Sequence, residues 1–320
     1  MSQAPLINID DFIKYAESQG FVGSKILRQI GIAINTAVAS NTVPALMLRG
    51  PAGSGKTWIT ELLARFLDAR YIFIQATPGM SEDELLYKYV PSERSTSGVE
   101  IVEGPLPEAL KLSQKTRVVL VIDEFDKTRP SADALLLDYL QNARVSLRIN
   151  NKKKLVVGRK ENLVVILTSN DFREFSEPLL RRVVSIFFEP PQPELVKELL
   201  RRKFDDERIV ELLSMIYTAG QYARLSKPIT IQELYQLGTA MKMYPDAKIE
   251  ELLLMFITKN YDDLYELQRA LEQLRADEFT STNNSNEVNI AETLIKKINE
   301  VNEIQQNQQA VNQSNNNNSN

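Results

Sequence analysis

The stretch Gly50-Pro51-Ala52-Gly53-Ser54-Gly55-Lys56-Thr57 decides the fold of this 320-residue chain. It follows an apolar run, Ala45 to Leu48, and precedes a segment, Trp58 to Leu67, whose apolar residues recur at helical spacing. The order of strand, glycine-rich loop and helix is the context in which the pattern G-x-x-x-x-G-K-[ST] binds phosphate. We therefore predict a P-loop that holds a nucleoside triphosphate, in preference to an accidental glycine-rich turn.

Each residue type in the P-loop has a chemical reason to be there. Gly50, Gly53 and Gly55 allow backbone dihedrals that are closed to larger residues, so that successive N–H groups turn towards an anion. The helix that follows adds the positive end of its dipole. We expect Lys56 to reach the β- and γ-phosphates of ATP, and the Thr57 hydroxyl to ligate the Mg²⁺ bound to them.

Two further strands are predicted to bring polar side chains to the edge of the sheet that carries the P-loop. The strand pattern Arg117 to Ile122 ends in Asp123-Glu124, and the pattern Leu163 to Leu167 is followed by Asn170. In an α/β sheet, the ligand site lies at the carboxyl ends of the strands. Asp123 suits a partner of Mg²⁺ and its water, Glu124 suits a base for the attacking water, and Asn170 suits a group that holds this water. The alternative interpretation is that Asp123 and Glu124 are only two acids at an exposed turn. The presence of a P-loop upstream favours the catalytic interpretation.

The amino-acid composition excludes several kinds of catalytic and metal-binding site. The chain contains no cysteine and no histidine, which excludes disulfides, zinc sites built from these residues and Ser-His-Asp triads. It has neither an apolar run of membrane-spanning length nor a signal-like N-terminus, so we expect a cytoplasmic protein without a membrane partner. The formal net charge of −4 lies in residues 277–320, and residues 1–276 are neutral. Overall charge therefore gives no support for nucleic-acid binding.

The periodicity of the whole sequence predicts an α/β fold followed by helices. Five strand patterns alternate with helices up to Phe188, which favours a five-stranded parallel P-loop sheet with flanking helices. Beyond a proline-rich junction only helical spacing is found, and the end of the chain has the asparagine-rich composition typical of disorder. The predicted segments are N-terminal helices packing on the core (1–40), an α/β nucleotide-binding domain (41–190), a small all-α lid domain (191–276) and a disordered tail (277–320).

A basic segment lies between two short strand patterns. Val145 to Ile149 and Leu155 to Val157 are predicted strands, and Asn150 to Lys154 is predicted to join them as a loop. The three lysines of this loop, Lys152 to Lys154, form either a solvated edge or a contact for a polymer that carries phosphates. The sequence leaves both interpretations open.

Taken together, these features resemble the AAA+ ATPases, and within them the MoxR-type group with its relatives in gas-vesicle and Rubisco-activation systems. The resemblance covers roughly residues 40–240. Beside the P-loop it rests on the Walker B segment Val121 to Pro130, the sensor-like segment Leu167 to Asp171, and Glu177 to Arg182.

The same resemblance implies where the variable segments lie. In the family, the sequence Glu103-Gly104-Pro105 follows an insert in the preceding helix, which is here Pro91 to Val102. The insert and the hairpin from Val145 to Val157 are then expected to face a central pore.

The resemblance also implies how the chain assembles. Members are usually hexameric rings in which an arginine of one subunit reaches the γ-phosphate held by its neighbour. Arg182 aligns better with this arginine finger, and Arg181 is the substitute candidate. Many members present a second arginine from the lid, whereas this chain has none there, and Lys227 is the candidate replacement.

Three functions agree with the sequence. The resemblance favours Mg²⁺-dependent ATP hydrolysis that remodels or activates a protein client. The second function is a motor that moves or packages nucleic acid, with Lys152 to Lys154 contacting the strand. The third is an ATP-bound assembly scaffold with slow turnover, whose tail recruits a partner. The pair Asp123-Glu124 favours a site that hydrolyses ATP over an inactive one. The P-loop does not separate the three functions, because all of them need it.

Overall fold

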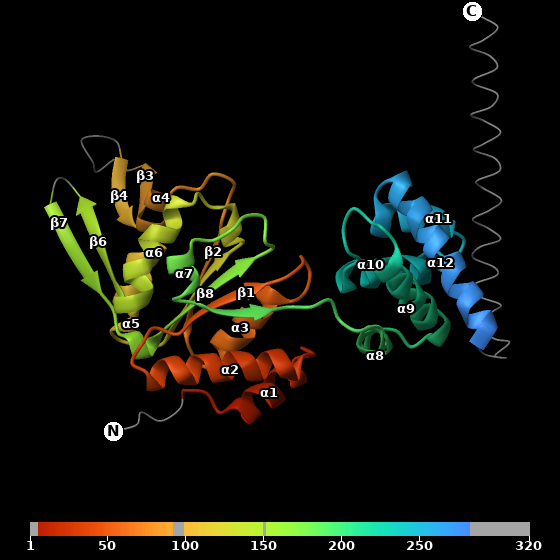
Figure 1. Ribbon diagram of the computed structural model, residues 1–320, viewed down its shortest axis with the longest axis horizontal. Coiled ribbons are helices and arrows are strands. Elements are labelled where there is room, and N and C mark those ends of the chain that lie inside the picture. Colours follow the sequence, from red (N-terminus) through yellow and green to blue (C-terminus); the bar gives the residue numbers. More distant parts are fainter. Residues whose placement is uncertain (1–5, 92–98, 150–151, 282–320) are drawn as a thin grey trace, which may run out of the picture. The chain divides into compact units, whose positions relative to one another are not determined.

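The computed structural model describes residues 6–91, 99–149 and 152–281, and the chain divides into two compact units, Met1–Pro190 and Pro191–Asn320 (Figure 1). At the centre of the first unit lies a parallel sheet with the strand order β2-β5-β8-β1-β9. Its strands are β1 (Ala45–Arg49), β2 (Arg70–Gln75), β5 (Val118–Asp123), β8 (Leu163–Ser169) and β9 (Val184–Phe187). The predicted α/β class and five-stranded parallel sheet are confirmed.

Strands β5 and β8 are apolar along most of their length because both faces of the sheet are covered. Every residue of these two strands is buried, as expected in the middle of a parallel sheet. Successive side chains point to opposite faces, so Leu120 and Ile122 pack into one apolar cluster, whereas Val119 and Val121 pack into the other.

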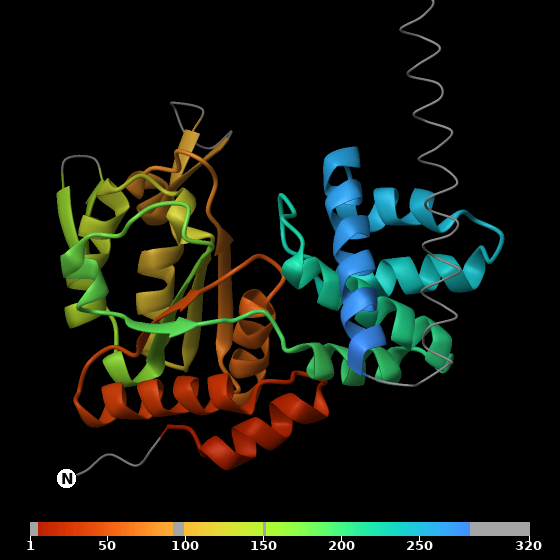
Figure 2. The same ribbon diagram turned by 45° about the vertical axis from the view of Figure 1, so that its right-hand side comes forward.

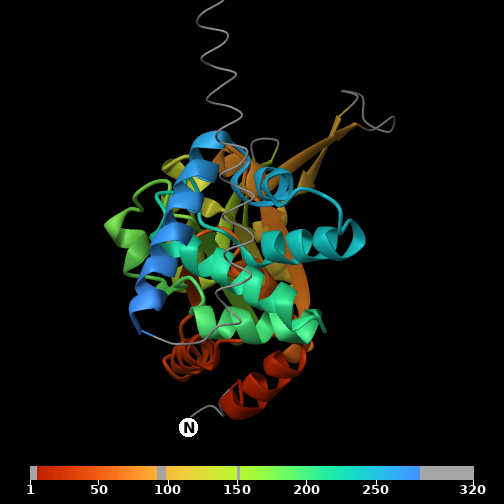
Figure 3. The ribbon, with the colours of Figure 1, turned by 90° about the vertical axis from the view of Figure 1, so that its right-hand side faces the viewer.

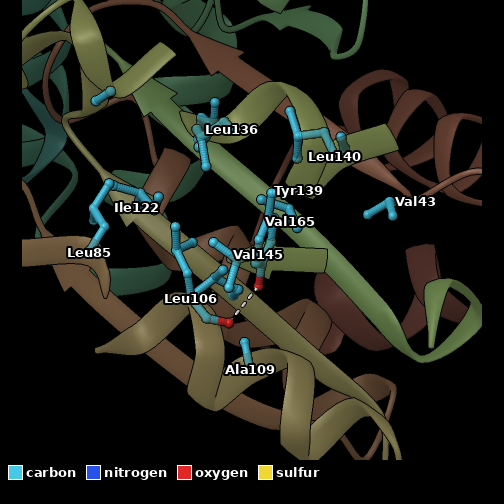
Figure 4. Packing of buried hydrophobic residues seen from close by; sticks show 14 of the residues in the cluster. Val43, Leu85, Leu106, Ala109, Ile122, Leu136, Tyr139, Leu140, Val145 and Val165 are labelled. Atoms are coloured by element: carbon cyan, nitrogen blue, oxygen red, sulfur yellow. Dashed lines mark hydrogen bonds between the residues drawn. The ribbon is translucent and has the colours of Figure 1, made fainter. Parts of the chain in front are cut away.

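Helices from different parts of the chain cover the two faces. On one face lie α5 (Pro105–Ser113) and α6 (Ser131–Asn142), where the Tyr139 hydroxyl donates to the Leu106 carbonyl over 3.1 Å inside an apolar cluster (Figure 4). The other face packs against α2 (Ser24–Ala39) and α3 (Lys56–Phe66), and α1 (Ile9–Ser18) packs on these two helices (Figure 2). The N-terminal helices thus share a core with the helix that follows the P-loop.

Two antiparallel hairpins extend the first unit beyond its central sheet. One pairs β3 (Tyr87–Pro91) with β4 (Val99–Glu103), and the other pairs β6 (Arg144–Ile149) with β7 (Lys152–Val157). Both lie at the same end of the unit (Figure 1). The first hairpin spans the predicted insert, of which residues 92–98 lie outside the described part of the chain.

The predicted loop from Asn150 to Lys154 is too long. Lys152 to Lys154 belong to β7, where the register places Lys153 opposite Arg148 and Lys154 opposite Leu147. Three consecutive charges resemble a loop in sequence, but the backbone hydrogen bonds of an antiparallel pair are indifferent to exposed side chains.

Short elements complete the first unit. A capping box formed by Ser81 and Glu84 opens a helix of only five residues. The remaining short elements are α4 (Glu82–Leu86), the 3₁₀ turns η1 (Phe125–Lys127) and η2 (Lys160–Asn162), and α7 (Glu177–Leu180).

The second unit consists of helices around their own apolar core (Figure 3). They are α8 (Pro193–Lys203), α9 (Glu207–Tyr222), α10 (Ile231–Met243), α11 (Ile249–Leu253), the π-helical turn η3 (Leu254–Thr258) and α12 (Tyr261–Ser281). Helix α12 continues past residue 276, and the rest of the predicted tail, residues 282–320, lies outside the described residues. Within the described ranges, no helix is both long and apolar enough to cross a membrane.

Candidate active site

The loop between β1 and α3 requires glycine where it begins and where it ends. Gly50 and Gly55 have φ angles of 145° and 88°, which larger residues rarely adopt. A Cβ atom on Gly50 would also lie 2.2 Å from the carbonyl oxygen of Phe188. Because α3 starts directly after Gly55, the N–H groups of its first turn have no partner within the helix and are available to an anion.

The Lys56 amine is held inside this loop. Its Nζ atom donates to the carbonyls of Gly50 and Pro51, at 2.7 Å each, and to Oδ1 of Asn170 at 2.9 Å. Burial lowers the pKa of the amine, and nearby carboxylates, that of Asp123 foremost, oppose this shift. A phosphate in the loop would give the ammonium a charged acceptor in place of neutral carbonyls, which makes a stronger hydrogen bond.

Thr57 and Asp123 place a hydroxyl beside a carboxylate. Thr57 Oγ1 donates to Oδ1 of Asp123 over 2.8 Å, and Thr168 Oγ1 donates to the same oxygen over the same distance. Mg²⁺ keeps several waters and takes one or two protein oxygens together with substrate phosphates, so this donor set fits the predicted ion. In the part of the chain that the structure describes, no cluster of three acidic residues offers another metal site.

Glu124 is presented by an uncommon backbone conformation. Its φ is 53°, in the left-handed region, and its N–H donates to Thr168 Oγ1 over 2.8 Å. The carboxylate accepts hydrogen bonds from Lys127 Nζ (2.6 Å), Gln75 Nε2 (3.2 Å) and Asn170 Nδ2 (3.3 Å). The bond from Lys127 is the largest cause that lowers the pKa of the Glu124 carboxyl. The group is therefore ionised at neutral pH, as a general base must be.

Asn170 connects the P-loop lysine to the Glu124 carboxylate. Its Oδ1 accepts from Lys56, and its Nδ2 donates to Glu124. The backbone N–H groups of Asn170 and Phe172 both donate to Oδ2 of the buried Asp126, at 2.9 and 3.0 Å. Asp126 thus fixes the loop that carries the Asn170 amide.

The two candidate finger residues lie outside this cluster. Arg181 is 73% exposed and pairs with Glu177 on α7. Arg182 donates to the carbonyl of Pro178 and to Oε1 of Gln141, each over 2.8 Å. The structure therefore brings the P-loop, Asp123, Glu124 and Asn170 together within one chain. The two arginines directly follow α7, and Arg182 is bonded to Gln141 of α6.

Three contributors to the cluster were missed in the sequence. Gln75 and Thr168 lie at the carboxyl ends of β2 and β8, and Lys127 follows Glu124 by three residues within η1. A position at the end of a strand was the available signal for the first two, but neither residue type is distinctive. The contact of Lys127 depends on the turn that η1 makes, which the sequence did not predict.

An aromatic pair also borders the P-loop. The Phe21 ring is buried, and its centroid lies 5.5 Å from that of Trp58, in the first turn of α3. A Cβ atom on Gly55 would approach the same Phe21 ring to 3.3 Å. The segment between α1 and α2 therefore forms one wall beside the loop.

Two of the other cations singled out in the sequence, Lys227 and Lys154, have acidic partners. Lys227 and Lys259 both donate to Oε1 of Glu233, at 2.7 and 2.9 Å. Lys154 donates to Oε1 of Glu103 over 3.1 Å, which joins the two hairpins. This pairing reduces the positive charge that the β6–β7 hairpin offers to a phosphate polymer.

Comparison with known proteins agrees with this geometry. Residues 45–186 match the family model described as an AAA domain of the dynein-related subfamily. The gas vesicle ATPase GvpN of Haloferax mediterranei is 27% identical over 188 residues, which are 52% of this chain and 54% of that protein. The Lon protease of Mycoplasma mobile is 27% identical over 251 residues, which are 74% of this chain and 25% of the protease.

Two further proteins are similar. The uncharacterized protein YojN of Bacillus subtilis is 26% identical over 176 residues, which are 52% of this chain and 55% of that protein. Among solved structures, a RuvB mutant of Thermotoga maritima has a TM-score of 0.46 at 15% identity and covers 79% of this chain and 72% of its own. The chain spans between a quarter and about half of the length of these curated relatives.

The matched range contains the whole candidate site. It begins in β1 and ends in β9, and so includes the P-loop, Asp123, Glu124, Asn170 and both arginines. The resemblance predicted from the sequence, to AAA+ ATPases with relatives in gas-vesicle systems, is confirmed: residues 45–186 match an AAA domain, and relatives named gas vesicle ATPase are among the matches.

Proposed function

We propose that this chain hydrolyses Mg²⁺-bound ATP and uses the hydrolysis to remodel or activate a protein client as part of a hexameric ring. One observation carries the hydrolysis. Thr57 bonds to Asp123, Lys56 bonds to Asn170, and Asn170 bonds to Glu124. The groups that would hold phosphate, metal and attacking water thus lie in one cluster, which supports a working hydrolase.

Each side chain has a task in this proposal. Lys56 exchanges its carbonyl partners for phosphate oxygens, and Thr57 and Asp123 hold the metal. When bound, Mg²⁺ neutralises the charge that develops on the phosphoryl oxygens. Glu124 orients the attacking water and accepts its proton. The amide of Asn170 keeps the Glu124 carboxylate turned towards that water.

The ring is supported by the position of the two arginines. Among the described residues, the partners of Arg181 and Arg182 are Glu177, Pro178 and Gln141, all outside the P-loop cluster of the same subunit. They are therefore available to a neighbouring subunit, where an arginine stabilises the charge on the transferring phosphoryl group.

A protein client is supported by the relatives and by the charge of the chain. One relative is named a protease, a class that acts on proteins, and another is named a heat shock protein. Residues 1–276 are neutral, and Lys154 is paired with Glu103. Both facts give a nucleic-acid motor less support.

Substitution of the proposed base tests the hydrolysis. We expect Glu124→Gln to retain ATP affinity and to lose turnover by about 10²–10⁴-fold, because proton transfer to a positioned base contributes that much. Binding is measured with a fluorescent ATP analogue and turnover by phosphate release. Glu108→Gln, which changes an exposed acid on α5, is the matched control. Undiminished turnover of Glu124→Gln would contradict the assignment.

The same variant tests the nature of the client. Held in ATP, Glu124→Gln should retain a protein that wild-type chain in ADP releases, and the turnover of wild-type chain should not respond to added DNA. If DNA stimulates turnover severalfold and no protein is retained, the nucleic-acid motor replaces the protein client.

A further inference from the structure

Arg173 and Asp133 form a buried ion pair beside the candidate active site. Arg173 lies in the loop between Asn170 and α7, and Asp133 lies in the first turn of α6. Nη2 of Arg173 is 2.7 Å from Oδ1 of Asp133, and Nη1 is 3.4 Å from Oδ2, so both carboxylate oxygens are engaged. The side chains are only 16% and 2% exposed. Burying two charges costs solvation free energy, which offsets much of their attraction, so such a pair is weak evidence for a gain in stability.

The Arg173 guanidinium also contacts the residues that follow Glu124. It donates to Thr128 Oγ1 over 3.2 Å and lies over the rings of Phe125 and Phe175, at 5.5 and 4.6 Å from their centroids. These two rings are stacked, with 5.9 Å between centroids and an interplanar angle of 9°. Since Phe125 is the next residue after Glu124, this packing joins the loop of Arg173 to the strand that presents the base.

Helix α6 holds the same segment at a second point. Oδ2 of Asp133 accepts from the N–H of Ser176, the N-cap of α7, over 2.8 Å. Near the other end of α6, Oε1 of Gln141 accepts from Nη2 of Arg182 over 2.8 Å. The segment from Arg173 to Arg182 is therefore attached to one helix at both of its ends.

We propose that Arg173 is a positioning residue, whose pair with Asp133 sets where Arg181 and Arg182 lie relative to the rest of their subunit. The inference rests on the proposed function, in which these two arginines complete the site of a neighbouring subunit. A displacement of a reacting group by about 1 Å costs about 10²-fold in rate. Loss of the buried pair should therefore reduce turnover without touching the P-loop of the same subunit.

The variant must remove the pair without leaving a buried charge unpaired. Arg173→Met combined with Asp133→Asn achieves this, because the asparagine oxygen still accepts from the Ser176 N–H while both charges are lost. The matched control is Arg144→Gln with Asp138→Asn. It breaks an exposed ion pair of 2.7 Å that starts from the same helix.

The first measurement separates binding from turnover. We expect the double variant, Arg173→Met with Asp133→Asn, to keep the KM and the ATP affinity of the wild-type chain and to lose about 10²-fold in kcat. The control pair should keep all three values. Equal losses in both double variants, or a loss of ATP affinity as large as the loss in kcat, would indicate a general structural role and overturn the inference.

The second measurement mixes subunits. Glu124→Gln subunits have intact arginines but an inactive site of their own, whereas the Arg173 variant has an intact P-loop cluster. Turnover should therefore recover when the two are mixed. A mixture of Glu124→Gln with Arg181→Ala and Arg182→Ala subunits should recover in the same way.

The two mixtures together show whether Arg173 acts on its own site or on that of a neighbour. If only the second mixture recovers, Arg173 acts within its own site, and the positioning of the arginines is refuted. If neither mixture recovers, the arginines do not act on a neighbour, so this part of the proposed function fails and the inference fails with it.

Discussion

Position 50 requires glycine for two reasons: its backbone conformation, and the lack of room for a Cβ atom. Gly50→Ala would place a methyl group 2.2 Å from the Phe188 carbonyl oxygen, whereas a methyl group on Gly79 would meet nothing within 4 Å. Both glycines have positive φ, so Gly79→Ala measures the backbone strain alone, about 1–2 kcal/mol.

We expect a lower melting temperature for both variants, with the larger fall for Gly50→Ala, because only this one adds a steric clash to the strain. Gly50→Ala should also lose ATP affinity, since β9 and the P-loop must move apart. Calorimetry and titration with an ATP analogue measure the two effects. Equal melting temperatures and equal affinities for the two variants would show that the clash is relieved without disturbing the loop.

At the scale of single elements, the buried strands were the easiest to predict. The residues of β5 and β8 form continuous apolar runs because helices cover both faces of the sheet, and the polar residues that end these runs mark the ligand edge. The placement of Asp123, Glu124 and Asn170 at one edge follows from this pattern alone.

The hairpins were harder to predict because their stability depends on residues that are distant in the sequence. The strands β3 and β4 were not predicted, and the first half of β7 was taken for a loop because Lys152 to Lys154 are all charged. The Tyr87 hydroxyl accepts from the backbone N–H of Arg148, and Glu103 pairs with Lys154. The same limitation applies to Gln75 and Lys127, whose contacts with Glu124 exist only after the strands and the turn have formed.

The start of α10 predicts a pH-dependent stability. Glu233 belongs to a capping box with Thr230 and accepts from Lys227 and Lys259. Burial acts to raise the pKa of the Glu233 carboxyl, but these hydrogen bonds overcome it and hold the pKa at about 2. Because this value lies below the unfolded value of about 4.3, the stabilisation is complete above that pH and is lost as the pH falls towards 2.

We expect Glu233→Gln to reduce the free energy of unfolding by on the order of 1–2 kcal/mol at neutral pH, since the lysine partners are 40% and 50% exposed and solvent screens the pairs. The difference from the wild-type chain should vanish near pH 2. Urea unfolding followed by circular dichroism at a series of pH values measures it. Glu251→Gln, at an exposed position of α11, is the control, and a difference independent of pH would refute the assignment.

At the scale of the whole molecule, the proposed site is divided between subunits. In this proposal, one chain holds phosphate, metal and water through the P-loop, Asp123 and Glu124, whereas Arg181 and Arg182 directly follow α7, outside that cluster. An isolated chain should therefore bind ATP and scarcely hydrolyse it. Its turnover per subunit should rise with protein concentration as neighbours associate.

Replacement of both arginines separates assembly from catalysis. We expect Arg181→Ala combined with Arg182→Ala to keep ATP affinity and to lose about 10³–10⁵-fold in kcat at any concentration, because no neighbour then supplies a guanidinium to the phosphoryl group. Light scattering and phosphate release across a dilution series measure assembly and turnover together. Lys25→Ala with Arg28→Ala, two exposed cations of α2, should behave as the wild-type chain does. Turnover per subunit that stays constant on dilution to the monomer would mean that one chain contains the complete site, because hydrolysis would then need nothing from a second subunit.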